Sequence, residues 1–416
     1  MSLTATVSEV QKTKLQNGLT IVSEKIPTYR SVAIGVWIKA GSRYESHLQK
    51  GLAHFIEHMV FKGTKSRTAL EIASLLEKYG GQLNAFTGKE ETCFYLHTID
   101  SHLDEGVEIL ADMVCNPSFI ENDIKLERQV VLEEISAVYD APEEYIFDLF
   151  QEKIFADQPM GYPILGDRES VKKFNRNSVK EFWKEYYQPS NIILSVTGNV
   201  DHNTLTDMAE KYFVFDSETS IKSCEKASPL ERNFFVLNRP VAQTHICMGN
   251  KSASYYDENR YDFMAISTYL GEGLSSRLFQ VLREKYGYAY SVYSFLDFYM
   301  DTGVLGFYIG TDPSNKNKAM EVLFAEFEKF RARMPEQEVI NMIKDQLIGR
   351  FLLSLESTYK RMVRLAKNEM YFGKYIDSEA VINSIEKISA QSVFNAAQTF
   401  FDRDKFTTVV ITPGKN

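Results

Sequence analysis

The stretch GLAHFIEHMVFKGT, residues 51–64, places two histidines around a glutamate at a spacing that suits metal chemistry. Its apolar pattern predicts a helix, on which His54 and His58, four residues apart, share one face. Two imidazoles one turn apart can bind one zinc ion, and Glu57 between them can reach a zinc-bound water. These residues indicate hydrolysis at a carbonyl carbon, with Glu57 as the general base. The alternative to a metal site is that one histidine is buried in the core and the other lies at the surface.

A catalytic zinc ion takes three protein ligands, so a third must come from elsewhere in the chain. The segment ENDIKLERQVVLEEISAVYD, residues 121–140, has the apolar spacing of a helix. Glu127 and Glu134 are seven residues apart and share one face, whereas Glu133 points away from it. We predict Glu134 as the third metal ligand and Glu127 as a carboxylate that orients a histidine N–H. For Glu133 we expect an ordinary solvated position.

The pattern of predicted helices and strands that positions these residues occurs twice along the chain. Glu-Lys-Tyr-Gly begins at Glu77 and again at Glu284, about half of the 416 residues apart. Each copy ends a helical segment and precedes a strand-like run, and the segments that follow match in the same order. The alternative is that the match arises by chance, because any α/β protein alternates helices and strands. We therefore predict an α+β fold of two homologous domains from an internal duplication. Each domain is expected to be a mainly antiparallel sheet with helices packed on one face.

The predicted domains are residues 1–218, which carry the metal motif, and 233–416, which do not. The polar, serine-rich segment 219–232 is the expected linker. The second half has YDENRYDFMAISTYLG where the first has the histidines, so only the first copy can bind the metal.

Composition excludes several classes of protein. The net charge of −9 argues against a nucleic-acid partner, and no apolar run approaches the length that spans a bilayer, so no membrane role is expected. The four cysteines are scattered without a C-x-x-C pair, which is typical of a reducing compartment. The N-terminal residues lack a secretory signal pattern, so we expect a cytoplasmic protein.

Four motifs together resemble the inverted-motif zinc peptidases, the family of pitrilysin, insulin-degrading enzyme and mitochondrial processing peptidase. HFIEH lies at residues 54–58, and ERQVVLEEI follows with Glu134 placed 76 residues after His58. GGQLNAFTGKEETCFY and LREKYGYAYSV resemble two further motifs of the processing-peptidase branch. The resemblance covers essentially the whole chain, in order.

This resemblance implies a zinc-dependent metalloendopeptidase with one Zn²⁺ per chain that cleaves short or unfolded peptides in an enclosed chamber. A two-domain chain would form that chamber as a homodimeric clamshell. Tyr290 would donate to the oxyanion and Arg283 would hold the substrate, from the same chain or from its partner. The strand that contains Asn84, Ala85, Phe86 and Thr87 would pair with the substrate if it lies at a sheet edge, and would otherwise be an internal strand.

Two other functions are compatible with the motifs. A non-catalytic assembly or core subunit of the same family would typically have lost a ligand, and here His54, Glu57, His58 and Glu134 are all present. A zinc hydrolase of non-peptide amides would keep the same residues. The physiological substrate and the cleavage preference do not follow from the sequence.

Overall fold

The computed structural model describes residues 9–78, 80–215, 221–229 and 233–414. The chain forms two compact units, which we call the N-unit and the C-unit. The N-unit contains the described residues up to Ile135, with Tyr162–Glu225 and Leu353–Tyr375. The C-unit contains Ser136–Gly161, Lys226–Leu352 and the described residues from Ile376 onward.

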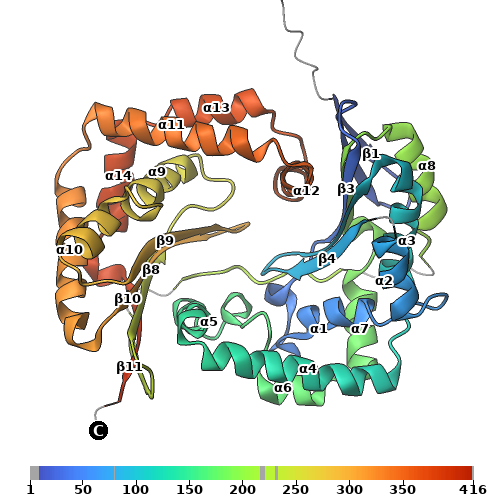
Figure 1. The fold of residues 1–416 in the computed structure, drawn as a ribbon, viewed down its shortest axis with the longest axis horizontal. Helices are drawn as coiled ribbons and strands as arrows, with labels where there is room; N and C mark the ends of the chain where they lie inside the picture. The colour runs from blue at the N-terminus through green and yellow to red at the C-terminus, as the bar shows by residue number, and fades with distance from the viewer. Residues whose placement is uncertain (1–8, 79, 216–220, 230–232, 415–416) are drawn as a thin grey trace, which may run out of the picture. The chain divides into compact units, whose positions relative to one another are not determined.

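The N-unit is built on a six-stranded sheet in the order β1-β2-β6-β3-β5-β4 (Figure 1). Only β2 and β6 pair in parallel among these neighbours. The central strands are buried apolar runs, whereas β4 lies at the edge and pairs with β5. The strands are β1 (Glu9–Lys14), β2 (Thr20–Lys25), β3 (Ser31–Ile38), β4 (Gln82–Thr87), β5 (Thr92–Ile99) and β6 (Ile192–Gly198).

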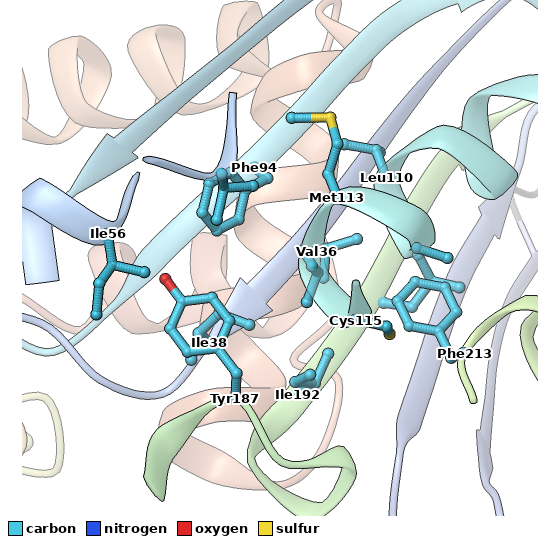
Figure 2. Packing of buried hydrophobic residues seen from close by; sticks show 14 of the residues in the cluster. Val36, Ile38, Ile56, Phe94, Leu110, Met113, Cys115, Tyr187, Ile192 and Phe213 are labelled. Carbon is cyan, nitrogen blue, oxygen red and sulfur yellow. The ribbon is translucent and has the colours of Figure 1, made fainter. Parts of the chain in front are cut away.

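Helices of the first half of the chain cover one face of this sheet. Their apolar stripes bury a core in which Val36 of β3 and Phe94 of β5 lie near Leu110 and Ile56 (Figure 2). The helices are α1 (Leu52–Val60), α2 (Ala69–Glu77), α3 (Leu103–Cys115), α4 (Glu121–Asp140), α6 (Arg168–Lys173), α7 (Arg176–Tyr186) and α8 (His202–Tyr212). The C-terminal residues of α4, from Ser136, belong to the C-unit.

The C-unit has a five-stranded sheet in the order β7-β11-β8-β10-β9, with only β7 and β11 in parallel. Its strands are β7 (Phe234–Arg239), β8 (Thr244–Lys251), β9 (Ser291–Phe298), β10 (Gly303–Thr311) and β11 (Thr407–Pro413). The helices of the second half are α9 (Arg260–Gly271), a π-helix (Phe279–Lys285), α10 (Lys316–Ala332), α11 (Gln337–Ser354), α12 (Thr358–Phe372), α13 (Ser378–Glu386) and α14 (Ala390–Phe400).

The two sheets repeat one topology. Five strands of the N-unit, β2-β6-β3-β5-β4, match the C-unit order strand for strand, and the parallel pair falls at the same place. Gly80 and Gly287, which end the two Glu-Lys-Tyr-Gly copies, have φ values of +68° and +62°, a backbone region that favours glycine. Tyr79 of the first copy lies outside the described residues. The predicted fold class is confirmed.

Each sheet has a second covered face, which the sequence did not reveal. Helix α12, from the second half of the chain, packs on β2, β3 and β6 of the N-unit sheet. There Trp37 donates its indole N–H to the Met362 sulfur at 3.3 Å. Helix α5 (Pro142–Ile154), from the first half, packs on β8 and β11 of the C-unit sheet. The two halves therefore exchange helices at corresponding places.

The expected linker, 219–232, is described only in part, because residues 216–220 and 230–232 lie outside the described residues. Residues 221–229 form neither helix nor strand. The Glu225 carbonyl accepts hydrogen bonds from Arg43, and the Ala227 amide donates to Asp301 at 3.0 Å. The domain limits at 218 and 233 stay predictions.

None of the helices in the described part of the chain is both long enough and apolar enough to cross a bilayer. The cytoplasmic location stays a prediction.

Candidate metal centre

Helix α1 presents the histidine pair because its opposite face is apolar. Phe55, Ile56 and Met59 are fully buried in the N-unit core, whereas both histidines and Glu57 are only partly buried. The helix begins after Gly51, whose φ of +87° suits a residue without a side chain.

A buried carboxylate fixes the start of this helix. Glu45 accepts hydrogen bonds from the backbone amides of Gly51 and Ala53, both at 2.8 Å. These amides belong to the unpaired donors of a helix N-terminus. Burial raises the pKa of Glu45 to about 8, and the hydrogen bonds from Ala53 and Gly51 oppose that rise. Glu45 therefore anchors the helix that carries the histidines.

The structure brings together His54, His58 and Glu134. Their ligand atoms lie within 4.8 Å of one another, and no other such group of three was found among the described residues. The ring centroids of the two imidazoles lie 4.5 Å apart. The His58 Nε2 is 3.7 Å from the Glu134 Oε2, too far for a hydrogen bond but close enough for both to bind one ion. Glu133, one residue earlier, is exposed.

Unsatisfied polar atoms show that these residues fit a metal ion. His54 Nδ1 and Glu134 Oε2 are buried, and neither has a hydrogen-bond partner in the described part of the protein. Leaving such an atom unpaired costs about 1–3 kcal/mol, so buried polar atoms normally have a partner. Two imidazoles and one carboxylate form a donor set that zinc prefers in catalytic sites.

The protonation of His54 also suits metal binding. Burial, and then the nearby His58, lower the pKa of His54 to about 3, so its ring is neutral at physiological pH and keeps a lone pair for a ligand bond.

Glu127 contacts the His58 imidazole at the ring nitrogen that is not proposed to bind the metal. Its Oε1 lies 2.7 Å from His58 Nδ1, which leaves Nε2 for the metal, and its Oε2 lies 2.5 Å from the Lys62 ammonium. Burial lowers the pKa of His58, but the hydrogen bond with Glu127 and the nearby carboxylates outweigh burial and raise it. The hydrogen bonds with His58 and Lys62 likewise overcome burial and lower the pKa of Glu127.

Glu57 is held beside the cluster by the edge strand. Thr87, the last residue of β4, donates its hydroxyl to Glu57 Oε2 at 2.5 Å. Burial raises the pKa of the Glu57 carboxyl, and the Thr87 hydrogen bond and His58 oppose that rise. A raised pKa brings a carboxyl closer to the range in which a general base is effective.

The predicted substrate strand is β4 itself. It forms the outer strand of the sheet, so one side of its backbone has no partner strand among those described. Asn84 is exposed, whereas Ala85 packs against the core and Phe86 packs edge-on against Trp37 at 5.4 Å. Within the described residues β4 is an edge strand and not an internal one, while its role in substrate binding stays a prediction.

Arg283 and Tyr290 belong to the C-unit, whereas the metal cluster belongs to the N-unit. Arg283 lies in the π-helix, with its guanidinium 5.0 Å from the Phe279 ring. Tyr290 is 56% exposed just before β9, and its amide donates to the Gly310 carbonyl. A π-helix is rare and is frequently found at functional sites. The roles of both residues stay predictions.

Sequence reasoning missed Lys62 and Glu45. Lys62 lies one turn after His58, so its spacing could have indicated a contact on the same side of the helix. Glu45 lies before the helix in an irregular segment, and no periodic pattern marks it.

The fold is a duplicated α+β layer with a His/His/Glu cluster that could hold a metal ion, and comparisons with known proteins agree. The family model described as insulinase (peptidase family M16) matches residues 20–168, and the one described as peptidase M16 inactive domain matches residues 173–347. This chain belongs to peptidase family M16, a family of metallopeptidases.

Similar proteins cover the whole length of the chain. "Uncharacterized zinc protease YmxG" of Bacillus subtilis (strain 168) is 37% identical over 98% of this chain and 99% of that protein. "Uncharacterized zinc protease ML0855" of Mycobacterium leprae (strain TN) is 35% identical over 97% of this chain and 92% of that protein. A crystal structure of a protease from Helicobacter pylori has a TM-score of 0.90 at 24% identity, covering 98% of this chain and all of that one, which shows the shared fold.

Proposed function

We propose that this chain is a zinc-dependent endopeptidase that cleaves short or unfolded peptides in an enclosed chamber. The observation that carries the proposal is the cluster of His54, His58 and Glu134, with Glu57 held beside it. The names of the relatives agree with a zinc protease. One zinc ion per chain is proposed because the second repeat has no histidine pair in α9.

Each residue of the cluster has a distinct chemical task. Zinc, when bound by the two histidines and Glu134, supplies a Lewis acid that polarises a carbonyl and makes water nucleophilic near neutral pH. Glu57 takes a proton from the attacking water as its oxygen adds to the carbonyl carbon. Glu57 then returns that proton to the amide nitrogen as the C–N bond breaks. Thr87 donates to Oε2 and so leaves Oε1 for the proton.

The substrate would bind as an added strand at the edge of the N-unit sheet. An extended peptide that pairs with the outer strand β4 gains backbone hydrogen bonds that do not depend on its side chains. Thr87, in the same strand, contacts the proposed base, so this strand would place the peptide next to Glu57. Tyr290 is proposed to donate to the oxyanion and Arg283 to hold a substrate carbonyl.

The decisive experiment is hydrolysis of a mixed pool of unstructured peptides, followed by mass spectrometry, with Glu57→Gln as the matched variant. We expect wild type to cleave and Glu57→Gln to retain its metal without turnover, because this change removes the base and no ligand. His58→Ala and Glu134→Ala should lose zinc, whereas Glu133→Ala should keep it. If Glu133→Ala alone strips the metal, the third ligand has been assigned one residue too late.

The same assay separates the two alternative functions. Absence of cleavage by zinc-loaded wild type, together with hydrolysis of simple amides, would favour a hydrolase of non-peptide amides. Absence of both activities would favour a non-catalytic assembly subunit.

We also propose that two copies form the chamber, with Arg283 and Tyr290 acting from either the same or the facing chain. Sedimentation analysis should then show a dimer. Mixing Glu57→Gln with Tyr290→Phe protein decides between the two arrangements. If Tyr290 acts across the dimer, mixed dimers regain activity, because one site combines an intact Glu57 with an intact Tyr290. If it acts within one chain, mixing restores nothing.

A further inference from the structure

A cavity of about 570 Å³ lies within the C-unit, among the ends of α9 and α10 and the beginning of α11. Leu270, Phe330 and Val339 give it an apolar lining. Tyr269 stacks on Phe330 with ring centroids 5.4 Å apart, and Met334 at the cavity is 41% exposed. A cavity with these surfaces suits an apolar or aromatic group.

The polar side of the cavity carries more positive than negative charge. Glu326, only 5% exposed, accepts from Arg277 Nε at 2.6 Å and from the Lys329 ammonium at 2.7 Å. Two cations thus share one buried carboxylate. Arg277 uses only Nε for this bond, and its two terminal nitrogens bond no acceptor in the described residues. Its side chain is 43% exposed, and Arg277 lines the cavity.

Arg67 of the N-unit provides a comparison. It precedes α2 as Arg277 precedes the π-helix, although the two do not occupy equivalent positions relative to the Glu-Lys-Tyr-Gly copies. Arg67 Nη1 and Nη2 bind Asp112 and Glu108 of α3, at 2.7 and 2.6 Å. Arg277 has Glu326 of α10 at Nε alone, so its terminal nitrogens lack the carboxylate partners that those of Arg67 have.

We infer that this cavity binds an amphipathic carboxylate, whose charged group takes both terminal nitrogens of Arg277 and whose apolar body lies on Phe330 and Leu270. A guanidinium matches a carboxylate with two parallel hydrogen bonds. The carboxylate can come from a free apolar acid or from the C-terminus of a peptide with an apolar last residue. The site shares no residue with the metal cluster or with the Arg283 and Tyr290 pair.

Calorimetric titration of full-length Glu57→Gln protein, which cannot cut the probes, tests this inference independently of catalysis. Octanoate should bind, and octanol should bind more weakly. Arg277→Gln should weaken octanoate binding about ten- to a hundredfold, since it removes charged hydrogen bonds. Arg331→Gln, the same charge change on α10 outside the cavity lining, should leave it unchanged. Met334→Glu, which retains Arg277 and repels an anion, should also weaken binding.

Peptides ending in phenylalanine, as the free acid or the amide, identify the source of the carboxylate. Binding of the acid but not the amide assigns the site to peptide C-termini, and binding of octanoate alone assigns it to free acids. The inference is overturned if neither probe binds, if octanol binds as tightly as octanoate, or if Arg277→Gln binds like wild type.

Discussion

At the scale of single residues, sequence spacing predicts some contacts within the site and gives no information on others. Helical periodicity alone separates Glu134 from Glu133, because neighbouring residues on a helix point about 100° apart. The structure places Glu134 with the histidines and leaves Glu133 exposed. Spacing gives no information on Thr87, whose contact with Glu57 depends on a strand and a helix meeting in space.

Glu127 provides a prediction at this scale. Glu127→Gln should lower zinc affinity about 10- to 100-fold, because the amide no longer holds His58 with a charged acceptor. It also replaces the carboxylate that lies 2.5 Å from the Lys62 ammonium with a neutral amide. Competition with a chromophoric chelator measures the affinity. Glu133→Gln on the same helix is the control, and an affinity of Glu127→Gln equal to that of this control would contradict the assigned role.

At the scale of elements, helix α1 depends on its N-terminal anchor. Glu45→Gln retains the shape of the side chain but offers one acceptor oxygen to two backbone donors, so the Gly51 or Ala53 amide loses its partner. We predict a loss of about 1–3 kcal/mol in unfolding free energy. Denaturant unfolding measures it, again with Glu133→Gln as the matched control. Equal stability of the two variants would show that the carboxylate does not anchor the helix.

The elements also show where sequence prediction ends. The repeat at Glu77 and Glu284 was sufficient to predict two homologous α+β layers, because local patterns specify strands and helices. Local patterns do not predict that β4 lies at the edge of its sheet. They also do not predict which sheet α5 and α12 pack against. An apolar face shows that a helix must be buried, but it does not identify the sheet that buries it.

At the scale of the whole molecule, each sheet requires a helix from the other half of the chain. A fragment of residues 1–225 lacks α12, which covers Val22, Trp37 and Ile193 on the second face of the N-unit sheet. Exposing each such side chain costs about 1.5–3 kcal/mol. We predict that this fragment aggregates when expressed alone.

Co-expression with residues 226–416 should restore a soluble complex, because that fragment supplies α12 and receives α5. Sedimentation and circular dichroism distinguish the complex from aggregate. A fragment 1–225 that is monomeric and unfolds cooperatively by itself would contradict the prediction.

The reciprocal helices also constrain the history of the chain. Helix α5 follows α4 as α12 follows α11, so in each repeat the corresponding helix packs on the sheet of the other repeat. Before its gene was duplicated, a single repeat would have had no second half from which to receive that helix. Its ancestor could bury both faces of its sheet only by trading the helix with an identical molecule, as a domain-swapped dimer. We infer that the present chain corresponds to such a dimer joined into one polypeptide, in which one copy carries the histidine pair and the other does not.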